Sequence, residues 1–449
     1  MLVYFSVENF KSINERIELN LKTAPRLRRL SHHTVAPTSD PSFKVLRNAV
    51  IYGANASGKS NIVKAIRYAQ NLVTGQRKQR RQLKLEPFKL TNNIRKDTSF
   101  CFEFIYNKAL FAYGFTLDGE KVKNEYYYHL DDKDNNYCFY ERVLNEDNIY
   151  DVHTDMFDDV TLPKEELDDL VKLIKYSPNN QLFIHEAHAN DYDVKLTEIG
   201  GIFIPALYFF FSQLIVIFPD TFYGALGKDL SSSCSYVDLL SRFDTGVSGL
   251  KSEDTNLSLF PKEVLDDVLE RLNEDGDFFI IQYRGKEYSF SYENGSVSVS
   301  KIVSTHRLID GTEIKFDLDQ ESDGTRRLID LLPALTGSVD ESGDEQTFTY
   351  IIDEFDRSLH PNLSKEFLNA FLNENLSDCQ NQLIVTTHES SLMDTKLLRR
   401  DAIWFVQKEE DHSTTLYSLN DYSPRFDKDI RTAYLSGIYG AVPHLETEN

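Results

Sequence analysis

The residues best suited to chemistry form a short glycine-rich loop between two apolar runs. The β-branched run 48–52 precedes the loop and predicts a strand, and the run 62–66 follows it and predicts a helix. A strand–loop–helix context is what the pattern G-x-x-x-x-G-K-[ST] needs in order to bind phosphate. The sequence therefore predicts a nucleotide-binding loop with the residues Gly53, Ala54, Asn55, Ala56, Ser57, Gly58, Lys59 and Ser60, followed by Asn61.

Each residue type in this loop has a chemical reason to be there. The glycines allow backbone N–H groups to curl around phosphates, and Lys59 brings a positive charge to the β and γ phosphates. Ser60 offers its hydroxyl to Mg²⁺, and the following helix directs its positive end at the nucleotide. A glycine-rich turn before a surface helix would explain neither Lys59 nor Ser60. We expect Gly53, Asn55, Ala56, Ser57, Gly58, Lys59, Ser60 and Asn61 to bind ATP.

An acidic pair follows a second predicted strand, about three hundred residues later. In the segment 347–361, an apolar run ends in Asp353 and Glu354. Asp353 can hold Mg²⁺, directly or through water, while Glu354 can polarise a water for attack on the γ phosphate. Alone, two acids after an apolar run are common at capped strand ends. Together with the loop they predict a metal ligand and a catalytic base.

Two further elements complete the predicted site. A third apolar run, 383–385, leads to His388, which can reach the γ phosphate and report its presence. Before the acidic pair, Ser322 and Gly324 stand where a helix with apolar periodicity would begin, and a helix N-terminus can bind an anion. Alone, the histidine reads as structural and the serine as an ordinary helix cap. Because they occur in this order together with the loop and the acidic pair, the functional interpretation of both gains support.

The length, charge and cysteine content of the chain limit what kind of protein contains this site. The length of 449 residues favours two lobes, or one lobe with a large insertion. The formal net charge of −22 argues against a surface that coats nucleic acid. Two short basic runs stand out, at 26–29 and 77–84. Each is typical of a solvated face, and the second is the better candidate for contact with nucleic acid or an acidic partner. The four scattered cysteines have no metal spacing and indicate reduced thiols in a cytoplasmic protein.

The order of predicted elements indicates an α/β fold with three parts. Residues 1–145 contain a first β-hairpin, the loop and a meander of strands from 99 to 145; residues 146–275 are mostly helical; residues 276–449 return to strands and carry the later motifs. The stretch 200–219 is as long as a membrane span. Two prolines and the Ser212-Gln213 interruption favour a helix through Phe211 followed by a buried strand, 214–217, with membrane insertion as the less favoured interpretation.

The succession of loop, serine–glycine signature, acidic pair and histidine resembles the ATP-binding-cassette (ABC) ATPases, and among them the SMC, Rad-fifty and RecF branch. Closer still, the chain is similar to stand-alone bacterial ATPases of the RloA and abortive-infection type, relatives of the ATPase half of OLD nucleases. This resemblance implies an ABC-ATPase head with an antiparallel β-subdomain and a helical insertion. The motifs that carry it are FSVENFKSI, GANASGKSN, EPFKL, SDGTRRLIDLLPAL, DEFDRSLHP, TTHESSLMD and YLSGIYGAVP.

The resemblance implies that Ser322 and Gly324 contact the γ phosphate bound by the opposite protomer, so that ATP joins a homodimer or a higher homo-oligomer. The chain departs from the pattern at Thr325, where SMC-type signatures have an acid, and at His360, where transporters usually have an aspartate. Gln82 and Gln320 are both candidates for the glutamine that senses the nucleotide in this family, and the sequence does not decide between them.

The resemblance also implies a role in phage defence, in which a dimeric ATPase controls a separately encoded nuclease or toxin and responds to a nucleic acid or a phage protein. Two alternatives are an ATP-gated scaffold that sequesters a toxin with little hydrolysis, and a DNA-repair ATPase. A transporter subunit is disfavoured because an LSGGQ sequence is missing. The cluster His185, Glu186 and His188 lacks the spacing of a zinc site, and we interpret it as a surface loop. We therefore expect no nuclease centre in this chain.

Overall fold

The computed structural model divides the chain into two compact units. The first comprises Met1–Phe218, Ser338–Phe355 and Cys379–Asn449, and the second comprises Pro219–Gly337 and Asp356–Asp378. The structure describes residues 1–25, 27–75, 83–90, 96–131, 136–159, 161–192, 199–219, 233–275, 278–293, 296–336, 338–339, 345–373, 380–422 and 429–443.

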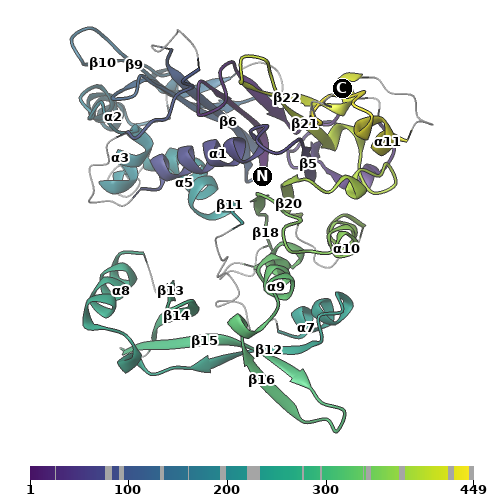
Figure 1. Ribbon diagram of the computed structural model, residues 1–449. Coiled ribbons are helices and arrows are strands. Elements are labelled where there is room, and N and C mark those ends of the chain that lie inside the picture. Colours follow the sequence, from purple (N-terminus) through teal and green to yellow (C-terminus); the bar gives the residue numbers. More distant parts are fainter. Residues whose placement is uncertain are drawn as a thin grey trace. The chain divides into compact units, whose positions relative to one another are not determined.

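A mostly parallel six-stranded sheet forms the centre of the first unit (Figure 1). Its order is β11-β19-β20-β5-β21-β22, and all neighbours are parallel except β21 and β22, which form the final hairpin. Strand β5 is buried along its whole length, as its apolar sequence requires between two covered faces. The strands are β5 (Asn48–Tyr52), β11 (Leu214–Ile217), β19 (Thr349–Ile352), β20 (Gln382–Thr387), β21 (Ile403–Lys408) and β22 (Thr414–Ser418).

A seven-stranded antiparallel sheet is the second layer of this unit. Its order, β10-β9-β8-β7-β6-β1-β2, confirms both the predicted N-terminal hairpin and the predicted meander. Buried and less buried residues alternate along most of β6, so one face packs on the core. The strands are β1 (Leu2–Glu8), β2 (Ile17–Asn20), β6 (Thr98–Tyr106), β7 (Ala109–Leu117), β8 (Val122–Leu130), β9 (Tyr137–Leu144) and β10 (Tyr150–His153).

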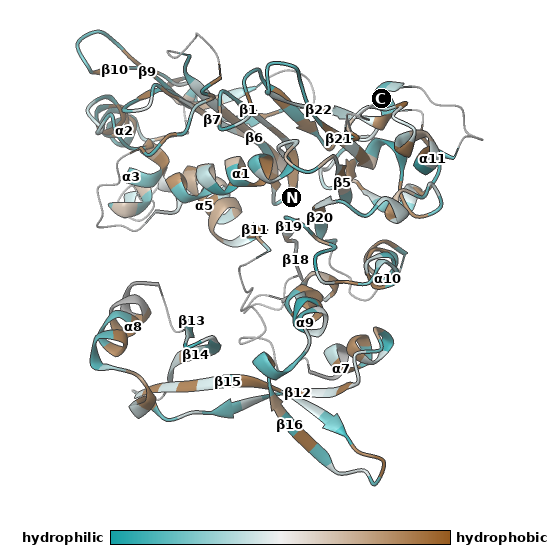
Figure 2. Ribbon diagram, viewed as in Figure 1, coloured by the Kyte–Doolittle hydropathy of each residue, from teal (hydrophilic) through white to brown (hydrophobic). Residues whose placement is uncertain are grey.

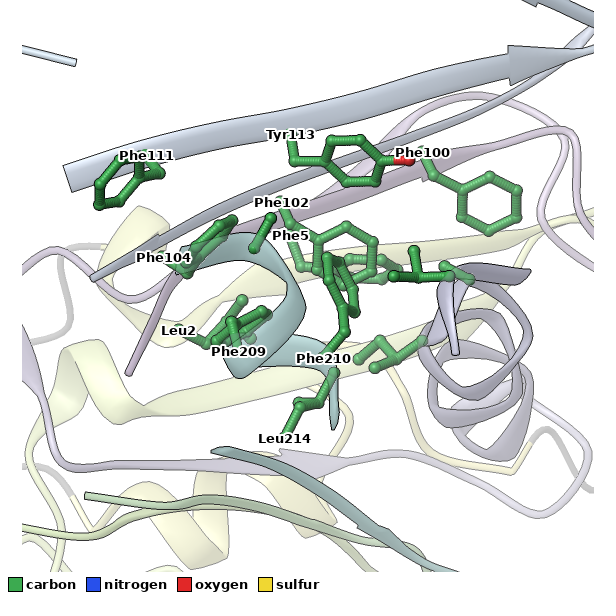
Figure 3. Packing of buried hydrophobic residues seen from close by; sticks show 14 of the residues in the cluster. Leu2, Phe5, Phe100, Phe102, Phe104, Phe111, Tyr113, Phe209, Phe210 and Leu214 are labelled. Atoms are coloured by element: carbon green, nitrogen blue, oxygen red, sulfur yellow. The ribbon is translucent and has the colours of Figure 1, made fainter. Parts of the chain in front are cut away.

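The long apolar stretch is part of the core of the first unit. It forms α5 (Ile204–Tyr208), a π-helical turn (Phe209–Gln213) and β11, which confirms a helix followed by a buried strand. Phe209 stacks on Phe104 of β6 with ring centroids 4.4 Å apart, and Phe210 meets Phe102 edge-on at 5.1 Å (Figure 3). In the described part of the chain, no helix is long and apolar enough to cross a membrane.

Amphipathic helices cover the sheets of the first unit. In Figure 2, α2 carries both hydrophilic and hydrophobic residues, and its buried residues are Leu167, Leu170 and Ile174, at helical spacing. Helix α1 directly follows the glycine-rich loop. The helices are α1 (Lys59–Val73), α2 (Lys164–Lys175), α3 (Phe183–Ala189) and the short α11 (Ile430–Leu435); two-residue strands pair as β3 (Thr34–Val35) with β4 (Val45–Leu46) and β17 (Ser338–Val339) with β18 (Glu345–Gln346).

The second unit combines helices with an antiparallel sheet of order β12-β15-β14-β13, to which β16 adds through β15. Strand β12 was not predicted, because its sequence VSGLKSED has a glycine and five polar residues. Gly249 allows close pairing, since a Cβ there would lie 2.7 Å from Oγ1 of Thr305. The elements are α7 (Ser233–Arg242), β12 (Val247–Asp254), α8 (Lys262–Asp275), β13 (Phe278–Tyr283), β14 (Lys286–Glu293), β15 (Ser296–Arg307), β16 (Glu313–Asp317), α9 (Asp323–Leu335) and α10 (Pro361–Asn373).

Candidate nucleotide-binding site

The glycine-rich loop joins the end of β5 to the start of α1, as predicted. Two of its residues have positive φ angles, 60° at Ala56 and 110° at Gly58. Left-handed residues of this kind turn successive backbone N–H groups toward one side, which makes a concave site for an anion. The local backbone is therefore shaped for phosphate.

The two glycines of the pattern also allow close packing against the final hairpin. A Cβ at position 53 would lie 2.5 Å from the carbonyl oxygen of Val406 in β21, and one at position 58 would lie 2.1 Å from Oγ1 of Thr414 in β22. Neither distance is compatible with a side chain. The absence of a side chain at Gly53 and Gly58 thus allows the loop to pack closely against the sheet.

Lys59 folds back over its own loop. Its Nζ atom donates hydrogen bonds to the carbonyl oxygens of Gly53 at 2.8 Å and Ala54 at 3.0 Å, and lies 3.3 Å from Nδ1 of His388. The residue is 5% exposed. The ammonium group is therefore held at the loop by neutral acceptors, where a phosphate would be a stronger partner.

The acidic pair lies at the carboxyl end of β19. Asp353 is 3% exposed, and its Oδ1 accepts a hydrogen bond from Oγ1 of Thr386 at 2.6 Å. The same hydroxyl oxygen accepts a bond from the backbone N–H of Glu354 at 2.8 Å. Glu354 has a φ of 47°, which is unusual for a residue other than glycine and is typical of functional turns. Thr386, which the sequence did not single out, therefore holds the Asp353 carboxylate and the backbone of Glu354.

The parallel register brings these elements to one edge of the sheet. Ile352 pairs with Val385, and Thr387 pairs with Tyr52, so Asp353, His388 and the loop all follow the carboxyl ends of neighbouring strands. Ligands of open α/β sheets bind at this edge. The contact between Lys59 and His388 joins two of the three elements directly. The loop, the acidic pair and the histidine are thus brought together as the sequence predicted.

The serine–glycine signature belongs to the second unit. Ser322 caps α9, as predicted, and its Oγ accepts a hydrogen bond from the backbone N–H of Thr325 at 3.1 Å. A Cβ at Gly324 would lie 2.8 Å from the carbonyl oxygen of Ser358, a residue with a φ of 62°. The glycine is therefore required for packing of the helix start against the segment that follows the acidic pair.

Side chains of the loop offer a further indication of a ligand. Ser57 is 2% exposed, and its hydroxyl has no hydrogen-bond partner within the described ranges. A buried polar group of this kind normally has a partner, and a phosphate oxygen would supply one. For Mg²⁺, the donors would be the Ser60 hydroxyl and the Asp353 carboxylate, which are hard oxygen ligands of the type that this cation prefers. The residues present therefore fit Mg-nucleotide.

The structure gives hydrogen-bond partners for Asn61 and for Gln320, one of the two candidate nucleotide-sensing glutamines. The Asn61 amide donates to Oγ of Ser12 at 2.7 Å, a partner that sequence analysis did not identify. Gln320 is exposed, and its Oε1 accepts a bond from the backbone N–H of Asp317 at 2.9 Å. Gln82 and the basic run Arg77–Lys84, apart from its last two residues, lie outside the described residues.

The interpretation of the histidine cluster as a surface loop is wrong. His185, Glu186 and His188 lie in α3, because Phe183, Ile184 and Ala187 recur at helical spacing and are buried. His185 is 8% exposed, and its Nδ1 lies 3.1 Å from the carbonyl oxygen of Val73 at the end of α1. Across the described segments, no group of three or more His, Cys, Asp or Glu side chains could hold a metal ion.

One family model covers both the loop and the strand-end motifs. A family model described as "AAA domain, putative AbiEii toxin, Type IV TA system" matches residues 49–191 and 236–394. Comparison with curated proteins gives no match. Among solved structures, an SMC head bound to the C-terminal winged-helix domain of ScpA is 14% identical with a TM-score of 0.38, covering 93% of this chain and 97% of that one. The SMC head domain from Thermotoga maritima is 13% identical with a TM-score of 0.35, covering 93% and 98%.

Proposed function

Because the chain belongs to this family, whose description names an AAA domain, a putative AbiEii toxin and a type IV TA system, we propose that it is a Mg-dependent ATP hydrolase that acts as a dimeric switch. The observation that carries the proposal is the gathering of the loop, the acidic pair and His388 at one edge of the parallel sheet. The expected α/β fold, an ABC-type ATPase head with an antiparallel β-subdomain, is the fold of the chain.

In this proposal each residue acts on a different part of the nucleotide. The backbone N–H groups of the loop and the Lys59 amine bind the phosphates, with Asn55, Ala56, Ser57 and Asn61 shaping the loop. Ser60 and Asp353 would hold Mg²⁺, which would neutralise charge on the phosphates when bound. Glu354 orients the attacking water and accepts its proton, and His388 donates a hydrogen bond to the γ phosphate. Thr386 holds the Asp353 carboxylate and anchors the backbone of Glu354.

The switch requires a second copy of the chain. Ser322 and Gly324 lie at the N-terminus of α9, a thirteen-residue helix whose positive end can meet the γ phosphate bound by a partner protomer. ATP then joins the two copies, and hydrolysis separates them. In the cytoplasm, the two states would differ in affinity for a separately encoded toxin or nuclease, which is what control of an effector requires.

Replacement of Glu354 by Gln tests the proposal. The amide keeps the shape of the side chain and cannot accept a proton, so we expect turnover to fall by about 10²–10⁴-fold while Mg-ATP stays bound. A dimer should then accumulate with ATP and not with ADP, as measured by light scattering. The matched control is Glu410→Gln, in the exposed turn of the final hairpin.

Two results would contradict the proposal. Turnover close to wild type in Glu354→Gln would show that Glu354 is not the catalytic base. A variant that stays monomeric at every ATP concentration would show that ATP does not join two copies. A wild-type chain that binds ATP and dimerises without measurable turnover would support the alternative of an ATP-gated scaffold.

A further inference from the structure

A chain of hydrogen bonds links the phosphate-binding loop to two distant parts of the first unit. The Asn61 amide donates to Oγ of Ser12 at 2.7 Å, Ser12 and Thr414 are joined through their hydroxyls at 2.7 Å, and Oγ1 of Thr414 donates to the carbonyl oxygen of Ser57 at 2.9 Å. Ser12 lies in the turn after β1, and Thr414 is the first residue of β22. Sequence positions 402 residues apart therefore meet at this loop.

The chemistry of the groups fixes the direction of this chain. A carbonyl oxygen can only accept, so Thr414 must use its single hydroxyl proton for Ser57. The bond between the two hydroxyls is then donated by Ser12, which in turn accepts from the Asn61 amide. Each hydroxyl donates once and accepts once, and all three bonds can be satisfied together.

Backbone hydrogen bonds hold Ser12 and Thr414, the two hydroxyl residues of this hydrogen-bond series, in place. The N–H of Thr414 donates to the carbonyl oxygen of Ser12 at 2.8 Å, and the backbone of Phe10 and Ile13 closes the turn with a pair of 2.8 Å bonds. Thr414 is 2% exposed. The hydroxyl that meets Ser57 is thus held by the sheet and the turn, independently of the loop.

The bond to Ser57 sets the direction of a phosphate-binding amide. A trans peptide is planar, so its N–H points opposite to its C=O. Because Thr414 fixes the Ser57 carbonyl on the side of β22, the N–H of Gly58 must point to the opposite side of the same peptide. A Cβ at Gly58 would lie 2.1 Å from Oγ1 of Thr414 and 2.9 Å from Oγ of Ser12, which shows how closely the hydroxyls approach this peptide.

We propose that Thr414 and Ser12 are positioning residues for the nucleotide, which hold the Ser57–Gly58 peptide so that the Gly58 amide faces the phosphates. This inference rests on the proposed function. It assigns to the final hairpin a role in nucleotide affinity: the hairpin carries the hydroxyl that keeps the loop in its binding conformation. The amide would bind the α and β phosphates, which ATP and ADP share. Because this contact would form already in the ground state, its loss should act mainly on binding.

Replacement of Thr414 by Val tests the inference, since valine keeps the shape and lacks the hydroxyl. One neutral hydrogen bond is lost, so we expect the Kd for Mg-ADP, measured by calorimetry, and the KM for Mg-ATP to rise together by about 3–10-fold, with kcat nearly unchanged. Thr414→Ser, which restores the hydroxyl, should recover wild-type affinity. The matched control is Thr415→Val on the same strand, whose hydroxyl donates to Glu409 at 2.7 Å and should leave the affinity unchanged.

If valine at position 414 disturbs folding, a second variant tests the same inference independently. Ser12→Ala leaves the Thr414–Ser57 bond in place and removes the donor behind it, so we expect a smaller rise in Kd. Equal affinities in wild type, Thr414→Val and Ser12→Ala would overturn the inference and leave the proposed function intact. Failure of Thr414→Ser to recover affinity would also overturn it. If the wild-type chain does not bind Mg-ADP, the proposed function and this inference both fail.

Discussion

The Nζ atom of Lys59 lies 3.3 Å from Nδ1 of His388, although the two residues are 329 positions apart in the sequence. Lys59 begins α1, and His388 follows β20, the strand paired with β5. An ammonium group can only donate, so Nδ1 acts as the acceptor and the proton of the neutral ring sits on Nε2. A phosphate that drew Lys59 away from its carbonyl partners would therefore also change the hydrogen bonding of His388.

Replacement of Lys59 by Ala should weaken the binding of Mg-ATP by about 10–100-fold, because a charge-assisted hydrogen bond of about 1.5–3 kcal/mol is lost. Calorimetry measures the affinity, and circular dichroism checks that the fold is kept. Lys64→Ala, on the exposed side of the same helix, is the matched control. Equal affinity in Lys59→Ala and wild type would contradict the assigned role.

Replacement of His388 by Ala should separate hydrolysis from binding. His388 is assigned to the γ phosphate, so the affinity for Mg-ADP should stay at the wild-type value while kcat falls by about 10²-fold, as for loss of a hydrogen-bond donor to developing charge. The control is His153→Ala, at an exposed position of β10. A loss of ADP affinity without a change in kcat would indicate that His388 acts only through Lys59.

The order of chemical motifs could be predicted because each motif is local. The loop, Asp353, Glu354 and His388 all directly follow apolar strands, and parallel pairing then brings them to one edge. Thr386 and Thr414 could not be predicted, since an ordinary threonine in a strand becomes a positioning residue only through pairing with a distant segment. The helix around His185 was missed because it is only seven residues long and its apolar positions are interrupted by polar ones.

The buried carboxylate of Glu125 should be essential for the stability of the antiparallel β-subdomain. It accepts hydrogen bonds from the hydroxyls of Tyr113 and Tyr140 and from the first backbone N–H groups of α3, and it pairs with Arg142 at 2.6 Å. Both charged side chains are 0% exposed. Glu125→Gln leaves Arg142 uncompensated, and we expect it to lower the free energy of unfolding by about 3–5 kcal/mol.

Urea unfolding monitored by circular dichroism measures the effect at Glu125. The control is Glu120→Gln, at the exposed turn between β7 and β8, which should change stability little. A Glu125→Gln variant as stable as wild type would show that the uncharged network satisfies Arg142 by itself.

Asp330 of α9 should make the stability of the chain depend on pH. Burial, and to a smaller extent the neighbouring Glu287 carboxylate, raise the pKa of Asp330 to about 8 against the opposing effects of Arg327 and Arg326. The unfolded value is about 3.9, so between these pH values the folded state binds one proton more than the unfolded state. Stability contributed by this group is therefore lost as pH rises through that window.

Replacement of Asp330 by Asn removes the titrating group while keeping its shape. We expect the thermal midpoint of the variant to exceed that of wild type at pH values above about 8, and this advantage to shrink steadily as pH falls toward about 4, because the protonated wild-type carboxyl is then as neutral as the amide. Asp266→Asn, at an exposed position of α8, is the control and should show no such trend. Burial also raises the pKa of Glu287, so the part of the pH dependence that Glu287 contributes should persist in the Asp330 variant and be lost when both acids are replaced. A difference between Asp330→Asn and wild type that is the same at every pH would show that the carboxyl titrates normally in the folded chain.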